Sequence, residues 1–200
     1  MRPVRVVTGR AVPLDRSDVD TDQIIPASWL KRVERTGFGG GLFAAWREND
    51  KDFVLNRPEY AGATVLVAGP NFGIGSSREH AVWALTDYGF QAVVSARFGD
   101  IFRNNATKVG LVPAEVDPEV GRALLDAATS DPSLEVTIDL ERLRVEAPAA
   151  GIEAAFALSP FTQHRLLEGL DDTGLTLRFT AEIGAYEAGR PAWLPSVARP

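Results

Sequence analysis

One stretch of the chain decides the fold: T-V-L-V-A-G-P-N-F-G-I-G-S-S-R-E-H-A-V-W-A-L, residues 64–85. Its first five residues form a continuous β-branched and apolar run, which is typical of a strand buried on both faces of a sheet. A glycine-rich turn follows and leads into an apolar helical stripe over residues 79–88, which Gly89 ends. The stretch therefore predicts a strand, a tight turn and a helix, as in the first half of a β-α-β unit.

Strands and helices keep alternating after this stretch. A second buried strand is predicted at residues 92–96, a helix at 99–108 and a further apolar strand at 111–113, which completes two β-α-β steps. Asp117 and Pro118 suit the N-cap and the first position of the next helix. We therefore expect an α/β fold whose sheet has a mostly parallel core.

From residue 134 the period of the pattern changes. Apolar and polar residues alternate over two arms in 134–147, which predicts an antiparallel hairpin added to the parallel core. We assign residues 1–191 to a single domain and residues 192–200 to a flexible tail. The other predicted elements are strands at 4–8 and 152–158 and helices at 28–34, 159–169 and 181–188.

The composition excludes several classes of function. The chain has 200 residues, of which 45% are hydrophobic and 24% charged, as in average soluble globular domains. Its net charge is -6, and no run of Lys and Arg reaches the density of a nucleic-acid-binding surface. The apolar runs are too short to span a membrane, and the first residues do not read as a signal peptide. We expect a cytoplasmic protein that binds neither nucleic acid nor membrane.

Cysteine is absent from the chain, and histidine occurs only as His80 and His164. The chain therefore cannot form disulfides or hold an iron–sulfur cluster through its own thiolates. Two histidines also make an all-protein zinc site a poor fit. We expect this chain to bind no metal or cofactor of its own, so that any metal chemistry has to come from another molecule.

The turn that precedes residues 79–88 fits neither of the two motifs that its composition suggests. A dinucleotide fingerprint requires a third glycine where this chain has Arg78, whose side chain prevents close contact between helix and strand. A hydrolase elbow requires glycines on both sides of the nucleophile, whereas Gly73 and Gly75 both precede Ser76. Neither a nucleotide site nor a serine triad is indicated.

A third interpretation, an anion site, follows from a strand, a glycine turn and a helix start in sequence. The first N–H groups of a helix have no acceptor within the helix and lie at the positive end of its dipole. Arg78 adds a guanidinium that suits a carboxylate, and Ser76 and Ser77 lie beside it. We expect the turn from Gly75 to Arg78 to bind a small carboxylate.

Structural alternatives stay open for three of these residues. The spacing of Ser76 and Glu79 matches a capping box, in which the two side chains only close the helix end, and we favour this for Glu79. For His80 we favour a histidine satisfied within the fold over a catalytic one. A capping box by itself explains neither the second serine nor Arg78.

The motif G-S-S-R-E-H at 75–80 resembles the swivelling-domain signature of the aconitase superfamily. Three further stretches extend the resemblance over nearly the whole chain, to the family of 3-isopropylmalate dehydratase small subunits. They are D-V-D-T-D-Q-I-I-P at 18–26, R-T-G-F-G-G-G-L-F at 35–43 and F-G-D-I-F-R-N-N at 98–105. L-L-E-G-L-D-D-T-G-L-T-L at 166–177 is similar to the bacterial form of the family.

The resemblance implies a single swivelling β/β/α domain and a hydro-lyase that interconverts 2-isopropylmalate and 3-isopropylmalate in leucine biosynthesis. It implies a large subunit, in a heterodimer or larger assembly, whose 4Fe-4S cluster takes the substrate hydroxyl at an open iron. Carried over by position, Ser76 is the base that removes the proton from carbon, while Ser77 and Arg78 hold a carboxylate of the small dicarboxylate substrate. Many relatives have cysteine where this chain has Ile74, a position that this chemistry does not need.

A serine base requires an environment that stabilises an oxyanion, because an unperturbed alcohol is far too weakly acidic at neutral pH. Backbone N–H groups, a helix start and Arg78 in a site without water supply that environment. Residues 35–43 form the most flexible stretch, with four glycines, and we expect substrate discrimination in its glycine loop at 37–41. Phe38 could meet an isopropyl group there, and Lys31 and Arg35 flank the loop. A plain linker is an equal alternative for this segment.

Asp18, Asp20 and Asp22 have the spacing of a calcium loop, but the glycine and terminal glutamate of an EF-hand are missing, so we favour a role in a turn and an interface. Two other functions of the chain stay open. One is a small subunit of a related hydro-lyase that acts on homoaconitate or a methyl-substituted malate. The other is a non-catalytic carboxylate-binding module, which would bind its ligand without a cysteine-rich partner.

Overall fold

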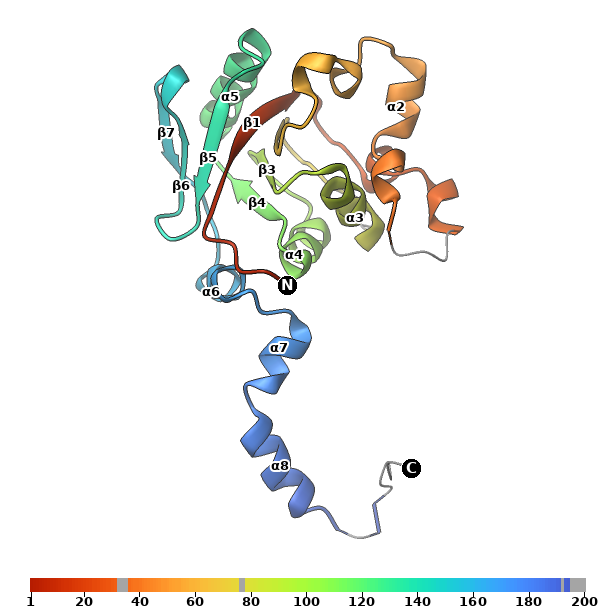
Figure 1. Ribbon diagram of the computed structural model, residues 1–200, viewed down its shortest axis with the longest axis vertical. Coiled ribbons are helices and arrows are strands. Elements are labelled where there is room, and N and C mark those ends of the chain that lie inside the picture. The colour runs from red at the N-terminus through yellow and green to blue at the C-terminus, as the bar shows by residue number, and fades with distance from the viewer. Residues whose placement is uncertain (32–35, 76–77, 192, 195–200) are drawn as a thin grey trace.

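The computed structural model describes residues 1–31, 36–75, 78–191 and 193–194. Its centre is a seven-stranded sheet in the order β4-β3-β2-β1-β5-β6-β7 (Figure 1). The parallel strands are β1 (Val6–Leu14), β2 (Val65–Ala68), β3 (Ala92–Ser95) and β4 (Val112–Glu115), and the antiparallel ones are β5 (Glu135–Asp139), β6 (Arg144–Ala147) and β7 (Ile152–Ala155). The predicted α/β fold with a parallel core and an antiparallel addition is confirmed.

The parallel half is built from the two predicted β-α-β steps. Helix α3 (Glu79–Tyr88) joins β2 to β3, and helix α4 (Asp100–Val109) joins β3 to β4. Every residue of β2 and β3 is buried, as their unbroken apolar runs require, because helices cover both faces of this half of the sheet.

Alternation along β1 divides the core into two layers. Val12 and Leu14 face the layer that contains α3 and α4, whereas Val7 and Ala11 face the layer that contains the hairpin and α5 (Pro118–Ser130). Helix α5 begins at the predicted N-cap, where the Asp117 carboxylate accepts a hydrogen bond from the Glu119 N–H at 2.9 Å. Successive side chains of a strand point to opposite faces, so one central strand serves both layers.

The two edges of the sheet meet, so that the sheet is curled. Ala157, which follows the edge strand β7, donates its N–H to the carbonyl of Glu115 at the end of the other edge strand, β4, at 2.9 Å. Joining the edges satisfies backbone groups that an open sheet would leave exposed. It also brings the chain after β7 beside α4.

Strand β1 is longer than the strand predicted at residues 4–8. Its second half, residues 11–14, is buried and pairs with β2 from Ala11↔Val65 to Leu14↔Ala68. Gly9 and Pro13 conceal this half in the sequence, because both residues are unfavourable within strands. Packing on both faces of the central strand overrides that preference.

The remaining short elements lie in the first third of the chain and after the hairpin. The helix predicted at 28–34 begins as a 3-10 turn, and residues 32–34 lie outside the described ranges. These elements are α1 (Thr21–Ile24), η1 (Ala27–Lys31), η2 (Phe38–Gly41), α2 (Ala44–Asn49), η3 (Val54–Asn56), η4 (Pro58–Tyr60) and η5 (Pro148–Ala150).

Three helices end the chain: α6 (Pro160–Glu168), α7 (Asp172–Leu177) and α8 (Thr180–Ala188). Ser159 caps α6 and Gly169 ends it, as predicted, whereas α7 was not predicted. The core ends at Leu166, and α7 and α8 extend away from the body of the molecule (Figure 1). The tail predicted at 192–200 lies outside the described ranges except for Trp193 and Leu194. No helix in the described ranges combines the length and the apolar character that crossing a membrane requires.

Candidate active-site turn and its relatives

The predicted anion turn lies where β2 ends, at the carboxyl edge of the parallel strands. This is the edge at which open α/β sheets bind their ligands. The chain leaves β2 at Ala68, passes through residues 69–75 and reaches α3 at Glu79. Asn71, Gly73 and Gly75 adopt left-handed backbone conformations, with φ of 61°, 74° and 85°.

Backbone hydrogen bonds clamp the turn from two sides. Gly73 and Ile74 both donate their N–H groups to the carbonyl of Val19, at 2.7 and 3.1 Å. On the other side Phe72 donates to the carbonyl of Arg97 and accepts from Gly99, both at 2.9 Å. Two N–H groups that could have faced a ligand are therefore used by the fold, so an anion has to be held by donors from Gly75 onward.

Gly73 is required by the close approach of α4. A Cβ atom on Gly73 would lie 2.3 Å from Cγ of Phe102, and one on Gly99 would lie 2.4 Å from the carbonyl oxygen of Gly73. Contacts this short exclude any side chain unless the backbone moves. Close packing against helix α4 and left-handed backbone conformations thus account for these glycines. A nucleotide-binding loop is not needed to explain them.

The acidic segment at 18–22 holds the turn through side-chain hydrogen bonds. The Asp18 carboxylate accepts from Nδ2 of Asn71 at 2.7 Å, and the Asp22 carboxylate accepts from Nη1 of Arg78 at 2.6 Å. Asp20 instead caps α1 in a reciprocal pair with Gln23. Each carboxylate has a different partner, and within the described ranges no group of three or more His, Asp or Glu side chains is arranged to hold a metal ion. This geometry favours the predicted turn role over a calcium loop.

Helix α3 begins at Glu79, with Arg78 at the N-cap in an extended conformation (φ -113°, ψ 143°). A capping box with Ser76 would place Glu79 at the third helical position, so that interpretation of Glu79 is wrong. The Arg78 side chain is 33% exposed. The N–H groups of Glu79 and His80 are the first of the helix, and such groups have no acceptor within the helix itself. Ser76 and Ser77 lie outside the described residues, so their roles stay predictions.

His80 packs in an aromatic group. Its ring centroid lies 5.3 Å from that of Phe38 and 4.7 Å from that of Trp83, and its side chain is half-buried. These contacts agree with the structural role that we favoured for His80. They also join the glycine segment to the first turn of α3.

The glycine segment is packed against the core, which corrects the expectation of a flexible loop at residues 38–43. A Cβ on Gly39 would lie 2.9 Å from the Tyr88 backbone nitrogen, and one on Gly41 would lie 2.5 Å from Cδ2 of Trp29. Phe38 is fully buried and donates its N–H to the Asp87 carboxylate at 3.0 Å.

This burial does not support substrate contact by Phe38, because no part of its ring reaches the surface. Of the two cations predicted near a substrate, Lys31 is exposed at the end of η1, and Arg35 lies outside the described residues. The structure therefore brings Gly75 and Arg78 together at the helix start, and leaves Phe38 in the core.

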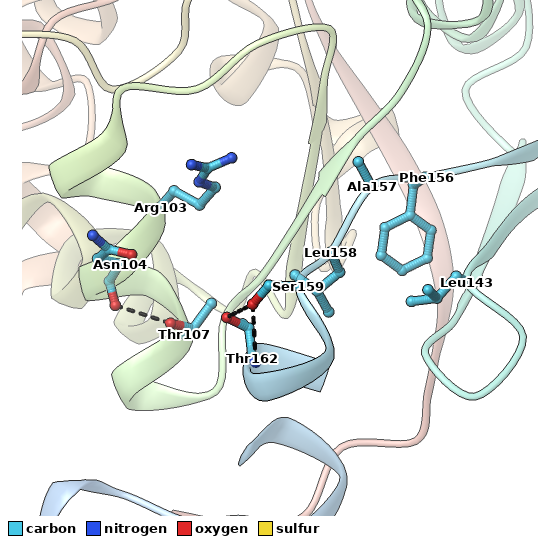
Figure 2. A pocket seen from close by; sticks show the side chains of 9 residues that line it. All are labelled: Arg103, Asn104, Thr107, Leu143, Phe156, Ala157, Leu158, Ser159 and Thr162. Carbon is cyan, nitrogen blue, oxygen red and sulfur yellow. Dashed lines mark hydrogen bonds between the residues drawn. The ribbon is translucent and has the colours of Figure 1, made fainter. Parts of the chain in front are cut away.

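A pocket of about 440 Å³ lies elsewhere, between α4 and the chain that leads into α6 (Figure 2). The Thr107 hydroxyl donates to the Asn104 carbonyl at 2.9 Å, and the Ser159 and Thr162 hydroxyls bond to each other at 2.8 Å. Arg103 pairs with carboxylates of its own α4 and of β4. The Thr107, Ser159, Thr162 and Arg103 side chains that line this pocket thus have partners within the fold, and none of the described residues of the turn lines it, so the turn is the better candidate site.

Comparison with known proteins agrees with the turn and the fold. Residues 1–119 match the family described as the aconitase C-terminal domain. The chain is 61% identical, over 196 residues, to the 3-isopropylmalate dehydratase small subunit of Frankia alni, with 98% of this chain and 99% of the relative covered. The chain belongs to the family of 3-isopropylmalate dehydratase small subunits.

Other members of the family agree over the same length. The small subunit of Streptomyces coelicolor is 59% identical over 188 residues, with 94% of each chain covered. A crystal structure of 3-isopropylmalate dehydratase from Methanocaldococcus jannaschii superposes with a TM-score of 0.66 at 27% identity, covering 91% of this chain and 99% of that one. The resemblance that the sequence motifs indicated is confirmed.

Proposed function

We propose that this chain is the small subunit of a cytoplasmic 3-isopropylmalate dehydratase, which interconverts 2-isopropylmalate and 3-isopropylmalate in leucine biosynthesis. The observation that carries the proposal is the 61% identity to a small subunit of that name over 98% of the chain. The clamped turn at the start of α3 is the part of the molecule that suits the chemistry, because it holds Gly75 and Arg78 beside the positive end of a helix.

In this proposal the chain supplies the base and a carboxylate site. Ser76, as an oxyanion, takes the proton from the carbon next to the one that bears the hydroxyl. The C–H electron pair forms the double bond, and the hydroxyl departs on the side of the partner subunit. Rehydration runs these events in reverse with water added at the neighbouring carbon. Ser77 and Arg78 hold one substrate carboxylate, so the reacting carbon stays within reach of Ser76.

Arg78 is fixed for this role by Asp22. One of its guanidinium N–H groups, at Nη1, donates to the Asp22 carboxylate at 2.6 Å, and we propose that the Nε and Nη2 groups bind a ligand carboxylate. An arginine held in this way has less side-chain entropy to lose on binding. Asp22 is thus proposed as a positioning residue for Arg78.

An iron–sulfur cluster does not fit this chain. The sequence has no cysteine, and no cluster-sized group of His, Asp and Glu occurs among the described residues. We propose that the large subunit, which the small-subunit name of the relatives implies, carries the 4Fe-4S cluster. The small subunit by itself is then an incomplete enzyme.

Reconstitution tests the proposal. The purified chain, its cognate large subunit and the mixture are each incubated with 2-isopropylmalate, and the formation of 3-isopropylmalate is measured. We expect turnover by the mixture only. Turnover by the isolated chain would contradict the proposal, and a mixture that prefers homoaconitate or a methyl-substituted malate would assign the chain to a related hydro-lyase.

A further inference from the structure

The last two helices form an arm, residues 171–190, that exposes large apolar side chains. Phe179 is 59% exposed, Leu177 62% and Tyr186 69%, and neither α7 nor α8, both fully described, contains a buried residue. The arm projects from the body of the molecule (Figure 1). Soluble monomers rarely expose neighbouring apolar side chains of this size, so such a surface marks a docking site.

The spacing on the arm indicates how a partner would bind it. Phe179 is the N-cap of α8, and Ile183 and Tyr186 follow it within the helix at the i+4 and i+7 positions, so the three residues lie along one side of α8. An amphipathic helix that docks into an apolar groove is recognised by anchors at this spacing, and aromatic anchors contribute most of the binding energy. Glu182 and Glu187 lie within α8 and Arg178 and Arg190 lie just outside its two ends, so the complementary groove is apolar with a rim of mixed charge.

Polar contacts hold the base of the arm against the body. The Asp171 carboxylate accepts from the Gly174 N–H at 2.7 Å and lies 3.5 Å from the N-terminal ammonium of Met1. Asp172 pairs at 2.9 Å with the buried guanidinium of Arg165 on α6. The arm is therefore directed by its base and does not start from a free linker.

The base of the arm lies at the opposite end of α4 from the active-site turn. Helix α4 starts next to Gly99, which packs on Gly73 of the turn, and ends before Gly110, near Met1. Ten helical residues separate these ends by about 15 Å. A partner that binds the arm would therefore contact a different part of the molecule from the candidate active-site turn.

The family comparison indicates which partner the arm serves. The matched family is named for a C-terminal domain, and the match covers residues 1–119, so the arm lies outside it. The separate small subunit of Frankia casuarinae is matched over 198 residues, 99% of this chain and 100% of its own length, which includes the arm. A domain at the C-terminus of a longer chain is held by its covalent link, whereas a separate subunit needs a non-covalent one.

We infer that the arm docks its Phe179–Ile183–Tyr186 face into an apolar groove of the large subunit, at a place remote from the active site. The inference rests on the proposed function for the identity of the partner. In this inference the arm binds the large subunit, and the turn takes part in the reaction.

The experiment uses the full chain and the cognate large subunit. Phe179→Ser with Tyr186→Ser is compared with Phe161→Ser, which changes an aromatic residue of α6 that is 60% exposed and lies outside the arm. Calorimetry measures the affinity for the large subunit, sedimentation measures self-association, and turnover is measured at saturating large subunit. Circular dichroism and the melting temperature confirm folding, which exposed residues should not alter.

We expect the double variant to bind the large subunit at least about 30-fold more weakly, as the loss of aromatic anchors predicts, with turnover within about twofold of the parent once the complex is saturated. Phe161→Ser should bind like the parent. Unchanged affinity of the double variant would overturn the inference. So would loss of a small-subunit dimer with unchanged affinity, which would assign the arm to a second copy of the chain. If the parent complex binds but does not turn over isopropylmalate, the proposed function fails and the binding result still decides the role of the arm.

Discussion

The candidate active-site turn and the C-terminal arm differ in the contacts that their glycines and apolar residues make. In the turn, Gly73 sits against the ring of Phe102 with no space for a methyl group, whereas Gly184 in α8 has no atom within 4 Å of its Cβ position. The turn is fixed by its own chain, and the arm leaves its apolar face uncovered. The turn is thus preorganised by packing, whereas the arm exposes the apolar face from which we infer docking to a partner.

The strongest test of this division is Ser76→Ala. If Ser76 is the base, turnover of the assembled enzyme should fall at least ~10²-fold, because a positioned base contributes roughly 10²–10⁴-fold. Binding of the large subunit and of substrate should change little, since Arg78 and the helix start remain. Steady-state kinetics and calorimetry on the complex measure these quantities.

Ser159→Ala is the matched control for a serine with a structural role, because the Ser159 side chain caps α6 by accepting from the Thr162 N–H and also bonds the Thr162 hydroxyl. It should lower stability by about 0.5–2 kcal/mol and leave turnover unchanged. If Ser76→Ala behaves like Ser159→Ala, Ser76 has only a structural role and the base belongs to the partner subunit.

The same substitution at two glycines should have opposite signs in the two regions. Gly73→Ala places a methyl group against Phe102 at a φ of 74° and should destabilise the chain by at least about 2 kcal/mol, which lowers the melting temperature by roughly 4–8 °C. Gly184→Ala should add about 0.5–1 kcal/mol of helix stability to α8. Calorimetry and amide exchange of the arm measure the two effects. A tolerated Gly73→Ala would show that the turn is less constrained than its contacts require.

Arg78→Lys tests whether the Arg78 guanidinium at the start of α3 binds a carboxylate of the substrate. The lysine keeps the positive charge but cannot make the bidentate hydrogen bond of a guanidinium to a carboxylate. KM should therefore rise about 10-fold, while kcat falls by a smaller factor. Asp22→Asn should shift KM in the same direction by a smaller factor, because it loosens Arg78 without removing it. A fall in kcat with unchanged KM in both variants would place Arg78 outside the carboxylate site.

The sequence predicts those strands and helix ends that depend on residues near one another in the chain. The apolar runs of β2 and β3, the Asp117 cap of α5 and the Ser159-to-Gly169 limits of α6 could be found from neighbouring residues. Asp22 and Arg78 pair across 56 residues of sequence, and no local pattern shows such a partner.

The glycines at 39 and 41 indicate flexibility in the sequence for the same reason: their neighbours in the fold lie far away along the chain. The space that they lack is taken by Tyr88 and Trp29, which reach them only in the folded chain. Composition records that a glycine is required but not whether motion or close packing requires it. The candidate site was predicted in outline because G-S-S-R-E-H is a local motif, whereas the support from the 18–22 segment was given only a general turn role.

The smallest expected effect concerns the base of the arm. The pKa of Asp171 is held below the 3.8 of an ordinary aspartate, chiefly by the hydrogen bond from the Gly174 N–H and further by the N-terminal ammonium. Because the pKa is lower in the folded chain than in the unfolded one, the carboxylate stabilises the base of α7 above about pH 4, and this contribution is lost as the pH falls through the folded pKa.

The chemical shift of the Gly174 amide proton, followed from pH 2 to 6, should titrate with a midpoint below 3.8. Asp171→Asn should abolish that titration while α7 persists, since asparagine also caps helices, and affinity for the large subunit should change by no more than about twofold. A midpoint at or above 3.8 would show that Asp171 does not hold the arm to the body, and the Asp172–Arg165 pair would then be the contact that directs the base of the arm.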